Sequence, residues 1–282
     1  MCYLCLAMTL QEFQQQLRSD GQYETPAGRN TASGGGFCAS ARFHGTVAAQ
    51  AISGGCKAWF GRYNFDVWAQ DSLVVLQAVE QLGGRVVCEG FAPRAAMRGP
   101  VVYIANHMSM LETMLLPCLL TSFSPVAIVL KDSLLHYPFF GSLCRAIAPI
   151  VVSRRNVRAD LQAVLDQGCA KLAAGSSVLL FPQGTRMTVF NPRRLNSMGA
   201  KLAQAARVPL VPIALQTDFI GIGRWIRDLG PVDPSRPVRF AAGAPLSPDQ
   251  PARVLHQQCL SFLADRFRAW GVPMEEDAAV DA

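Results

Sequence analysis

Seven short apolar segments, rich in Val, Ile, Leu and Ala, recur through the middle of the chain. They cover residues 86–91, 101–105, 126–130, 150–153, 178–181, 210–215 and 238–241. Each has the length of a buried strand and is too short for a typical helix. Segments of helical pattern lie between them at about 110–120, 158–174 and 197–206. Strands that alternate with helices predict an α/β fold with a mixed, largely parallel sheet flanked by helices.

The two ends of the chain differ from this middle part. A capping-box pattern at Thr9–Glu12 predicts a short amphipathic helix over about 10–18, and a second helix fits 66–82. Residues 19–56 are rich in Gly and Ser and predict a mobile linker. A last helix is expected from Ser247 onward. We therefore predict an N-terminal helical and linker region at 1–84 that associates with a membrane interface, an α/β domain at 85–246, and a C-terminal helix with an acidic tail at 247–282.

Composition excludes several classes of protein. Half of the 282 residues are hydrophobic and 16% are charged, which does not fit a disordered chain. The nine cysteines are odd in number and lack zinc-type spacing, so we expect neither a disulfide framework nor a metal site, and Cys2 and Cys5 form only an isolated pair. The apolar stretch 113–130 is interrupted by Pro117 and Pro125, so no membrane span is predicted. The start of the chain lacks the basic region of an export signal.

Positive charge is concentrated in the middle of the chain. Residues 94–239 contain 17 basic and 7 acidic side chains, a net +10, whereas the whole chain is only +6. This segment is where an anionic partner would bind, and phosphate is the obvious candidate. Nucleic acid is disfavoured because the basic residues are dispersed among apolar strands without a stacking motif.

The first candidate site follows the strand at 101–105 and reads Asn106-His107-Met-Ser109-Met-Leu-Glu112. Ser109 and Glu112 have the spacing of a capping box, which places His107 in the loop before a helix and lets it fold back toward Glu112. A carboxylate that holds one imidazole nitrogen makes the other a better general base. Spacing alone leaves two interpretations open: a catalytic pair, or a cap beside an ordinary loop histidine.

The second candidate site, Phe181-Pro-Gln183-Gly184-Thr185-Arg186, also follows an apolar strand. Proline and glycine favour a turn, and an arginine side chain can bind phosphate or carboxylate through two parallel hydrogen bonds. Alone, this pattern is also compatible with a tight turn and a solvated arginine.

Together, in this order and spacing, the two segments resemble the glycerolipid (lysophosphatidic-acid type) acyltransferase family. Its signature begins Asn-His-x-x-x-x-Asp and continues with Phe-Pro-Glu-Gly-Thr-Arg; this chain departs by having Glu112 and Gln183. The stretch 148–154, ending in Arg154, and the stretch 208–213 are similar to two further family blocks.

The resemblance implies a lysophospholipid acyltransferase. His107, oriented by Glu112, would activate the free hydroxyl of a lysolipid, most simply 1-acylglycerol-3-phosphate, for attack on acyl-CoA or acyl-carrier protein, giving phosphatidic acid without a cofactor. Gly184, Thr185, Arg186 and Arg154 would bind the phosphate, with Asn106, Lys131 and Gln183 as secondary contacts. The enzyme would act at the cytoplasmic face of the inner membrane, as a peripheral or monotopic protein.

Three alternatives stay open at this stage. The acceptor could be another lysolipid, such as a lyso-ornithine lipid. The chain could be a lipid or thioester hydrolase, although neither Ser109 nor Thr113 lies in a Gly-x-Ser-x-Gly motif. It could also be a non-catalytic protein that binds anionic membranes.

Overall fold

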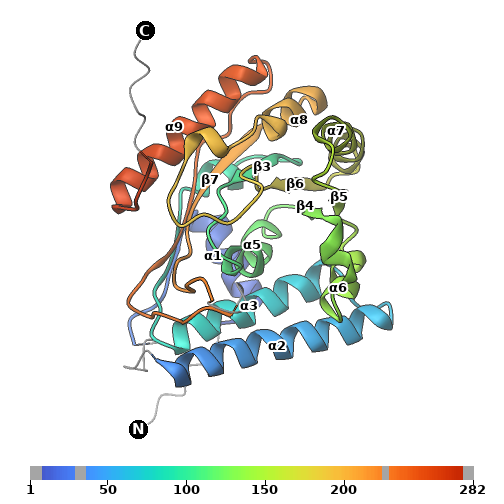
Figure 1. Ribbon diagram of the computed structural model, residues 1–282. Coiled ribbons are helices and arrows are strands. Elements are labelled where there is room, and N and C mark those ends of the chain that lie inside the picture. The colour runs from blue at the N-terminus through green and yellow to red at the C-terminus, as the bar shows by residue number, and fades with distance from the viewer. Residues whose placement is uncertain (1–7, 29–35, 224–228, 276–282) are drawn as a thin grey trace.

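The computed structural model describes residues 8–28, 36–223 and 229–275 and contains one eight-stranded sheet (Figure 1). The strand order is β1-β2-β8-β7-β3-β6-β4-β5. The strands are β1 Tyr23–Glu24, β2 Val86–Glu89, β3 Val102–Ala105, β4 Val126–Lys131, β5 Ile150–Val152, β6 Ser177–Leu180, β7 Leu210–Gln216 and β8 Val238–Ala242.

Most neighbouring strands are parallel. β3 lies near the centre and pairs in parallel with both β6 and β7, and β4 pairs in parallel with β6 and β5. β2 and β8 are also parallel to each other, whereas β1–β2 and β7–β8 are antiparallel. The predicted mixed, largely parallel sheet is confirmed. All seven predicted strands are present, and their ends lie within two residues of the expected positions.

Helices cover both faces of the sheet. Helices α7, α8 and α9 lie on one face; α1, α3 and α5 lie on the other, where α2 runs alongside α3 (Figure 1). The helices are α1 Leu10–Asp20, α2 Phe37–Trp59, α3 Phe65–Gln81, α4 Ala92–Ala95, α5 Leu111–Leu120, α6 Phe140–Ala146, α7 Val157–Ala173, α8 Met198–Ala206 and α9 Ala252–Trp270, with short 3-10 turns η1 Asp132–His136 and η2 Pro192–Arg194.

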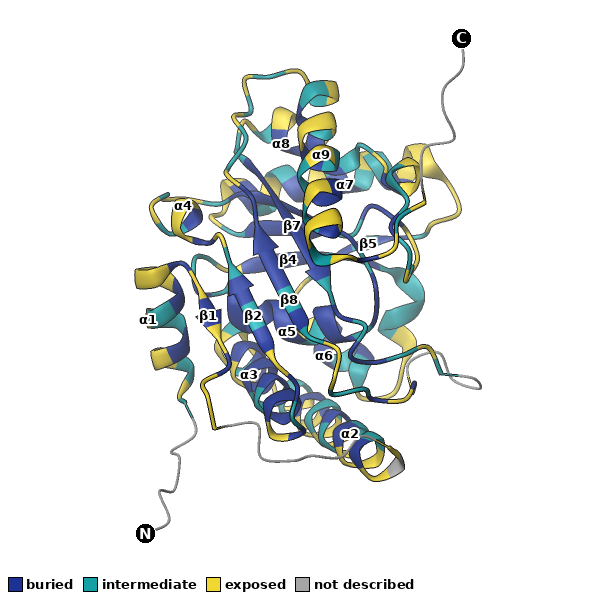
Figure 2. Ribbon diagram, turned by 90° about the vertical axis from the view of Figure 1, so that its left-hand side faces the viewer, coloured by how far each residue is buried: buried dark blue, intermediate teal, exposed yellow. Residues whose placement is uncertain are grey.

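The central strand shows why this sheet is buried on both sides. Successive side chains of a strand point to opposite faces. Val102 and Ile104 of β3 accordingly pack with the core beneath α7, α8 and α9, whereas Tyr103 and Ala105 pack with the core beneath α3 and α5. Continuous apolar sequence, rather than alternation, is the pattern that parallel strands between two helical layers require. Figure 2 shows the strands buried and the outer sides of the helices exposed.

Helix α2 contradicts the prediction of a mobile linker over residues 19–56. It runs from Phe37 to Trp59 and buries Ala39, Phe43 and Val47, which recur every fourth residue. A Cβ at Gly55 would lie 2.8–2.9 Å from atoms of Phe139, just before α6. The glycines that indicated a linker therefore include one that allows two elements to approach closely.

Other boundaries differ more modestly. Helix α9 begins at Ala252 rather than at Ser247, because Leu246 still pairs with Leu210 and the residues after it form a turn. Cys2, Cys5, residues 29–35 and nearly all of the acidic tail lie outside the described residues. Within the described ranges, no helix is long and apolar enough to cross a membrane.

Candidate active site

The carboxyl ends of five parallel strands meet at one edge of the sheet, which is where α/β folds place ligands. The strands are β3, β4, β5, β6 and β7. The polar groups that follow them are His107 after β3, Lys131 at the end of β4, Arg154 after β5, Gln183 to Arg186 after β6, and Thr217 after β7. The topology therefore gathers residues that are more than 100 positions apart in the sequence.

His107 and Glu112 are in direct contact. Nδ1 of His107 lies 2.7 Å from Oε1 of Glu112, and the histidine side chain is 16% exposed whereas the carboxylate is fully buried. The imidazole ring stacks on Phe181, with ring centroids 4.7 Å apart. A carboxylate on Nδ1 fixes the proton there and leaves Nε2 as the nitrogen that can accept one.

Several donors surround the Glu112 carboxylate. The amide N–H groups of Met108 and Ser109 donate to Oε1 at 2.6 and 2.9 Å, and the hydroxyls of Ser109 and Thr217 donate to Oε2 at 2.9 and 2.5 Å. Burial raises the pKa of Glu112. The hydrogen bond and charge of His107, together with the hydrogen bond from Thr217, lower this pKa by more than burial raises it. The net pKa lies below the ordinary value, so Glu112 is held as an anion beside the histidine.

The start of α5 differs slightly from the predicted capping box. The helix begins at Leu111, one residue later than expected, so Glu112 is its second residue. The Ser109 hydroxyl accepts from the Leu111 amide at 3.0 Å, and the Ser109 amide donates to Glu112. One of the two expected reciprocal bonds, from the Ser109 amide to the Glu112 carboxylate, is therefore present, whereas the Ser109 hydroxyl accepts from the amide of Leu111 instead of Glu112.

The loop after β6 is joined directly to the loop that carries His107. The side-chain oxygen of Gln183, which is buried, accepts from the His107 amide, and the Met187 amide donates to the His107 carbonyl at 2.9 Å. Gln183 thus positions the histidine backbone. An amide oxygen can accept this bond as well as a carboxylate can, so the glutamine does not disrupt the geometry.

The predicted phosphate-binding residues fall into two groups. Arg154, Arg186 and Lys131 line the same cavity as His107. Arg154 has a left-handed backbone with φ 58°, its amide donates to Asp160 at 2.8 Å, and its guanidinium donates to the Gly184 carbonyl. Gly184 and Thr185 are exposed on the same loop and do not belong to the cavity wall.

Asn106 has a position that the sequence did not indicate. Its side chain is 2% exposed, its Nδ2 donates to the Leu215 carbonyl at 3.0 Å, and its Oδ1 accepts from the Leu215 amide at 2.7 Å. These two bonds fasten the loop after β3 to β7. Asn106 therefore positions the loop rather than lining the cavity.

Thr217 is the residue that sequence reasoning missed. It is fully buried, and its hydroxyl lies 2.5 Å from Glu112 and 3.1 Å from the Ser109 hydroxyl. Threonine after an apolar strand is common and carries no motif. Its place at the carboxyl end of the strand neighbouring β3 would have been a usable indication, had the strand order been known.

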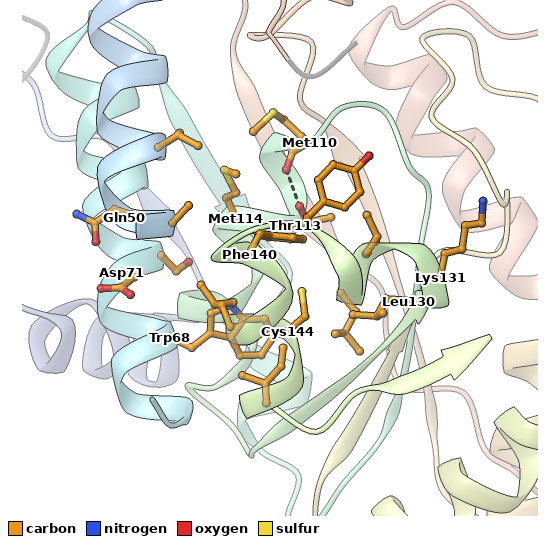
Figure 3. Close-up of a pocket in the computed structure, with 18 of the residues that line it drawn as sticks. Gln50, Trp68, Asp71, Met110, Thr113, Met114, Leu130, Lys131, Phe140 and Cys144 are labelled. Atoms are coloured by element: carbon orange, nitrogen blue, oxygen red, sulfur yellow. Dashed lines mark hydrogen bonds between the residues drawn. The ribbon is translucent and has the colours of Figure 1, made fainter. Parts of the chain in front are cut away.

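His107 lines a cavity of about 380 Å³. Figure 3 shows part of the wall of this cavity. Its cationic residues are Lys131, Arg154 and Arg186, and most of the remaining wall is apolar and comes from α2, α3, α5, β4 and α6. Representative apolar residues of the wall are Val47, Val75, Met114, Leu130, Phe140 and Leu143. The cavity thus has a cationic region near the histidine and an apolar compartment between helices.

One segment of the chain matches a known protein family. Residues 85–216 match the model of the Acyltransferase family, and that segment includes both candidate motifs, 106–112 and 181–186. This segment, a little less than half of the chain, is thus similar to the Acyltransferase family. The family match and the curated relatives support the resemblance to the glycerolipid acyltransferase family that the motifs indicated.

The individual relatives agree with this assignment. A 1-acyl-sn-glycerol-3-phosphate acyltransferase of Pseudomonas aeruginosa is 36% identical over 115 residues, 41% of this chain and 44% of that protein. A lyso-ornithine lipid O-acyltransferase of Rhizobium meliloti is 36% identical over 104 residues, 37% of this chain and 33% of that protein. These alignments thus span less than half the length of the curated relatives.

The fold has a counterpart among solved structures. The crystal structure of the 1-acyl-sn-glycerophosphate acyltransferase PlsC from Thermotoga maritima superposes with a TM-score of 0.64 at 18% identity. The match covers 85% of this chain and 97% of that one. At this identity the likeness establishes the shared fold, including elements outside residues 85–216.

Proposed function

We propose that the chain is a lysophospholipid acyltransferase that transfers a fatty acyl group from acyl-CoA or acyl-carrier protein to the free hydroxyl of 1-acylglycerol-3-phosphate. The observation that carries this proposal is the placement of His107. It is held through Nδ1 by Glu112, and it lines a cavity that also presents three cations and a largely apolar wall. A base, an anion site and an acyl compartment therefore meet at one place.

In the proposed reaction His107 is a general base. Its Nε2 takes the proton of the acceptor hydroxyl as the oxygen attacks the thioester carbonyl, and the imidazolium that forms is stabilised by Glu112. The new C–O ester bond forms, the C–S bond breaks, and the thiolate leaving group receives the proton from His107. No acyl-enzyme and no cofactor beyond the acyl donor are needed.

The cations support a phosphate-bearing acceptor. Arg186 and Arg154 come from the loops after β6 and β5, and Lys131 ends β4, so three positive side chains approach the cavity from three strands. Guanidinium groups bind phosphate oxygens through paired, charge-assisted hydrogen bonds. Because Arg154 also donates to the Gly184 carbonyl, a shift of one cation is coupled to the loop that carries the other.

Exposed aromatic side chains near the cavity support action at a membrane surface. Trp59 and Phe60 at the end of α2 are 82% and 75% exposed, and Tyr137 and Phe139 before α6 are 58% and 51% exposed. Trp and Tyr, whose rings carry a polar edge, favour the membrane interface, and exposed Phe rings add apolar area to such a surface. We place this face on the cytoplasmic side of the inner membrane, as a peripheral or monotopic contact.

Vesicle binding tests the membrane contact. Flotation with anionic vesicles should fall several-fold for Trp59→Ala combined with Phe60→Ala. Val157→Ala, which removes an 80% exposed residue on the opposite side of the sheet, is the matched control and should float like the unaltered protein. Equal flotation of both variants would contradict a membrane contact at this face.

An acyl-transfer assay tests the reaction itself. Purified protein is incubated with radiolabelled acyl-CoA, or acyl-carrier protein, and one of three mixtures: lysophosphatidate, lyso-ornithine lipid, or no acceptor. Labelled phosphatidic acid should be the main product. The lyso-ornithine arm is included because the Rhizobium enzyme matches this chain at the same identity as the Pseudomonas one. Free fatty acid without an acceptor would indicate a hydrolase, and no turnover in any mixture would contradict the proposal.

A further inference from the structure

The proposed reaction does not use two exposed arginines at the start of α7. Arg155 and Arg158 follow the cavity residue Arg154, one in the loop after β5 and the other in the first turn of the helix. The side chain of Arg155 is 83% exposed, and its ion pair with Asp132 is long, at 3.7 Å. Among the residues that the structure describes, the guanidinium of Arg158 has no ion-pair or hydrogen-bond partner. Both guanidinium groups are therefore accessible to an anionic ligand.

These arginines lie at the rim of the cavity, on the side where β4 and β5 end. Arg154, which precedes Arg155, lines the cavity, and so does Lys131, which precedes the Asp132 that pairs with Arg155. In Figure 3, Lys131 lies across the cavity from α2 and α3. Residues 131–132 and 153–160 together contain four basic and two acidic side chains. The rim is therefore net positive on the side away from the apolar compartment.

The strand order separates these arginines from the catalytic histidine. His107 follows β3 and Arg155 follows β5, and β6 and β4 lie between those two strands. Neighbouring strands are about 4.8 Å apart, so three spacings correspond to about 14 Å. Arg186, in contrast, is in the loop after β6, the direct neighbour of β3, and the guanidinium of Arg154 reaches back to Gly184 in that loop. The cations therefore form a near group at β6 and a far group at the start of α7.

The two substrates of the proposed reaction carry phosphate at two different distances from the reacting atoms. In 1-acylglycerol-3-phosphate the phosphate is on the carbon next to the one that bears the free hydroxyl, which suits the near group. The acyl donor carries its thioester on a pantetheine arm with a phosphate at the other end. Extended, this arm is about as long as four residues of extended chain, about 14 Å. The far group lies at the distance that the donor phosphate requires.

We propose that Arg155 and Arg158 bind the phosphate at the end of the pantetheine arm of the acyl donor. The inference rests on the proposed acyltransferase function and assigns the two substrates to separate cations. Coenzyme A and acyl-carrier protein both have this arm and this phosphate, so the site serves either carrier. Guanidinium groups suit the role because they bind phosphate oxygens through paired, charge-assisted hydrogen bonds.

A series of donors with one acyl chain tests the site. The donors are acyl-pantetheine, which lacks the phosphate, acyl-4′-phosphopantetheine, acyl-CoA and acyl-carrier protein. For the unaltered protein we expect kcat/KM to be about ten-fold higher with acyl-4′-phosphopantetheine than with acyl-pantetheine. Arg155→Ala combined with Arg158→Ala should reduce this gain to about two-fold or less, and should leave the KM for lysophosphatidate unchanged, because the acceptor phosphate is bound by the near group.

Arg253→Ala is the matched control. Arg253 is an exposed arginine and the second residue of α9, as Arg158 is the second residue of α7. Helix α9 begins shortly after Leu246, which pairs with Leu210 at the amino end of β7, the edge of the sheet opposite to His107. This variant should keep the full gain from the phosphate.

Binding of labelled coenzyme A, measured by equilibrium dialysis, needs no turnover. The double variant should bind it about ten-fold more weakly than the unaltered protein, and Arg253→Ala should bind it equally well. Binding lost in the double variant, without transfer from any donor, would support the phosphate site and contradict the proposed function.

Three results would overturn the inference and leave the acyltransferase function intact. One is transfer without a gain from the arm phosphate, and another is a gain that the double variant retains. The third is a loss with acyl-carrier protein that is absent with acyl-4′-phosphopantetheine, which would assign the arginines to the surface of the carrier protein. Reduced flotation with anionic vesicles, together with unchanged donor kinetics, would overturn it as well and assign them to the membrane.

Discussion

Glu112 contacts His107 from a fully buried position, with 2.7 Å between Oε1 and Nδ1, and is itself held by hydroxyl and amide donors from two strand ends. The carboxylate cannot move without breaking several hydrogen bonds. The imidazole is therefore oriented before any substrate binds, and this preorganisation is the structural basis of the proposed base catalysis.

Thr217 should matter although it touches no substrate. Thr217→Val keeps the shape but removes the hydroxyl that donates to Glu112, so we expect unfolding free energy to fall by about 2 kcal/mol and kcat to fall about ten-fold. Thr121→Val is the matched control, because its hydroxyl donates to the Pro117 carbonyl at the far end of α5. Urea unfolding and steady-state kinetics measure both effects. Equal losses in the two variants would contradict a role of the Thr217 hydroxyl in holding Glu112.

Gln183 should act through its acceptor oxygen and not through charge. Gln183→Glu keeps an oxygen for the His107 amide, so most activity should be retained. Gln183→Leu leaves that buried amide unpaired and should lower kcat by about ten-fold with little change in KM. Kinetics of both variants checks this, and a loss of similar size in both would assign position 183 a role other than the acceptor oxygen.

The cations should affect acceptor binding more than turnover. Arg186→Ala and Arg154→Ala are each expected to raise the KM for lysophosphatidate about ten-fold or more, because a charge-assisted contact to phosphate is lost. Arg158→Ala, an exposed arginine at the start of α7, is the control. An unchanged KM in both cavity variants would indicate that the phosphate binds at another site.

The lowered pKa of Glu112 predicts a pH dependence of stability. The folded value lies below the ordinary value of 4.5, so the unfolded chain binds the proton more readily. The stabilisation by this carboxylate is present above pH 4.5 and is lost as the pH falls through the folded value. Urea unfolding from pH 7 to pH 3 should show the stability advantage over Glu112→Gln shrinking in acid, and an advantage that stays constant would contradict this.

The sequence predicted the sheet well because its strands are continuous apolar runs, which leave few other structures open. The prediction failed at α2, because a helix whose glycines allow close packing can have the same composition as a flexible linker. The contact of His107 with Glu112 followed from local spacing within one loop. The roles of Thr217 and Gln183 did not, because both depend on which strands are neighbours, and strand order is not a local property of the chain.

Acyl transfer by His107→Ala, measured as labelled phosphatidic acid formed from lysophosphatidate and acyl-CoA, tests most directly whether His107 is the base. We expect kcat to fall about a thousand-fold or more, with thermal unfolding close to that of the unaltered protein, since the histidine side chain is at the cavity wall. Wild-type turnover by a folded His107→Ala variant would contradict the assignment of His107 as the base.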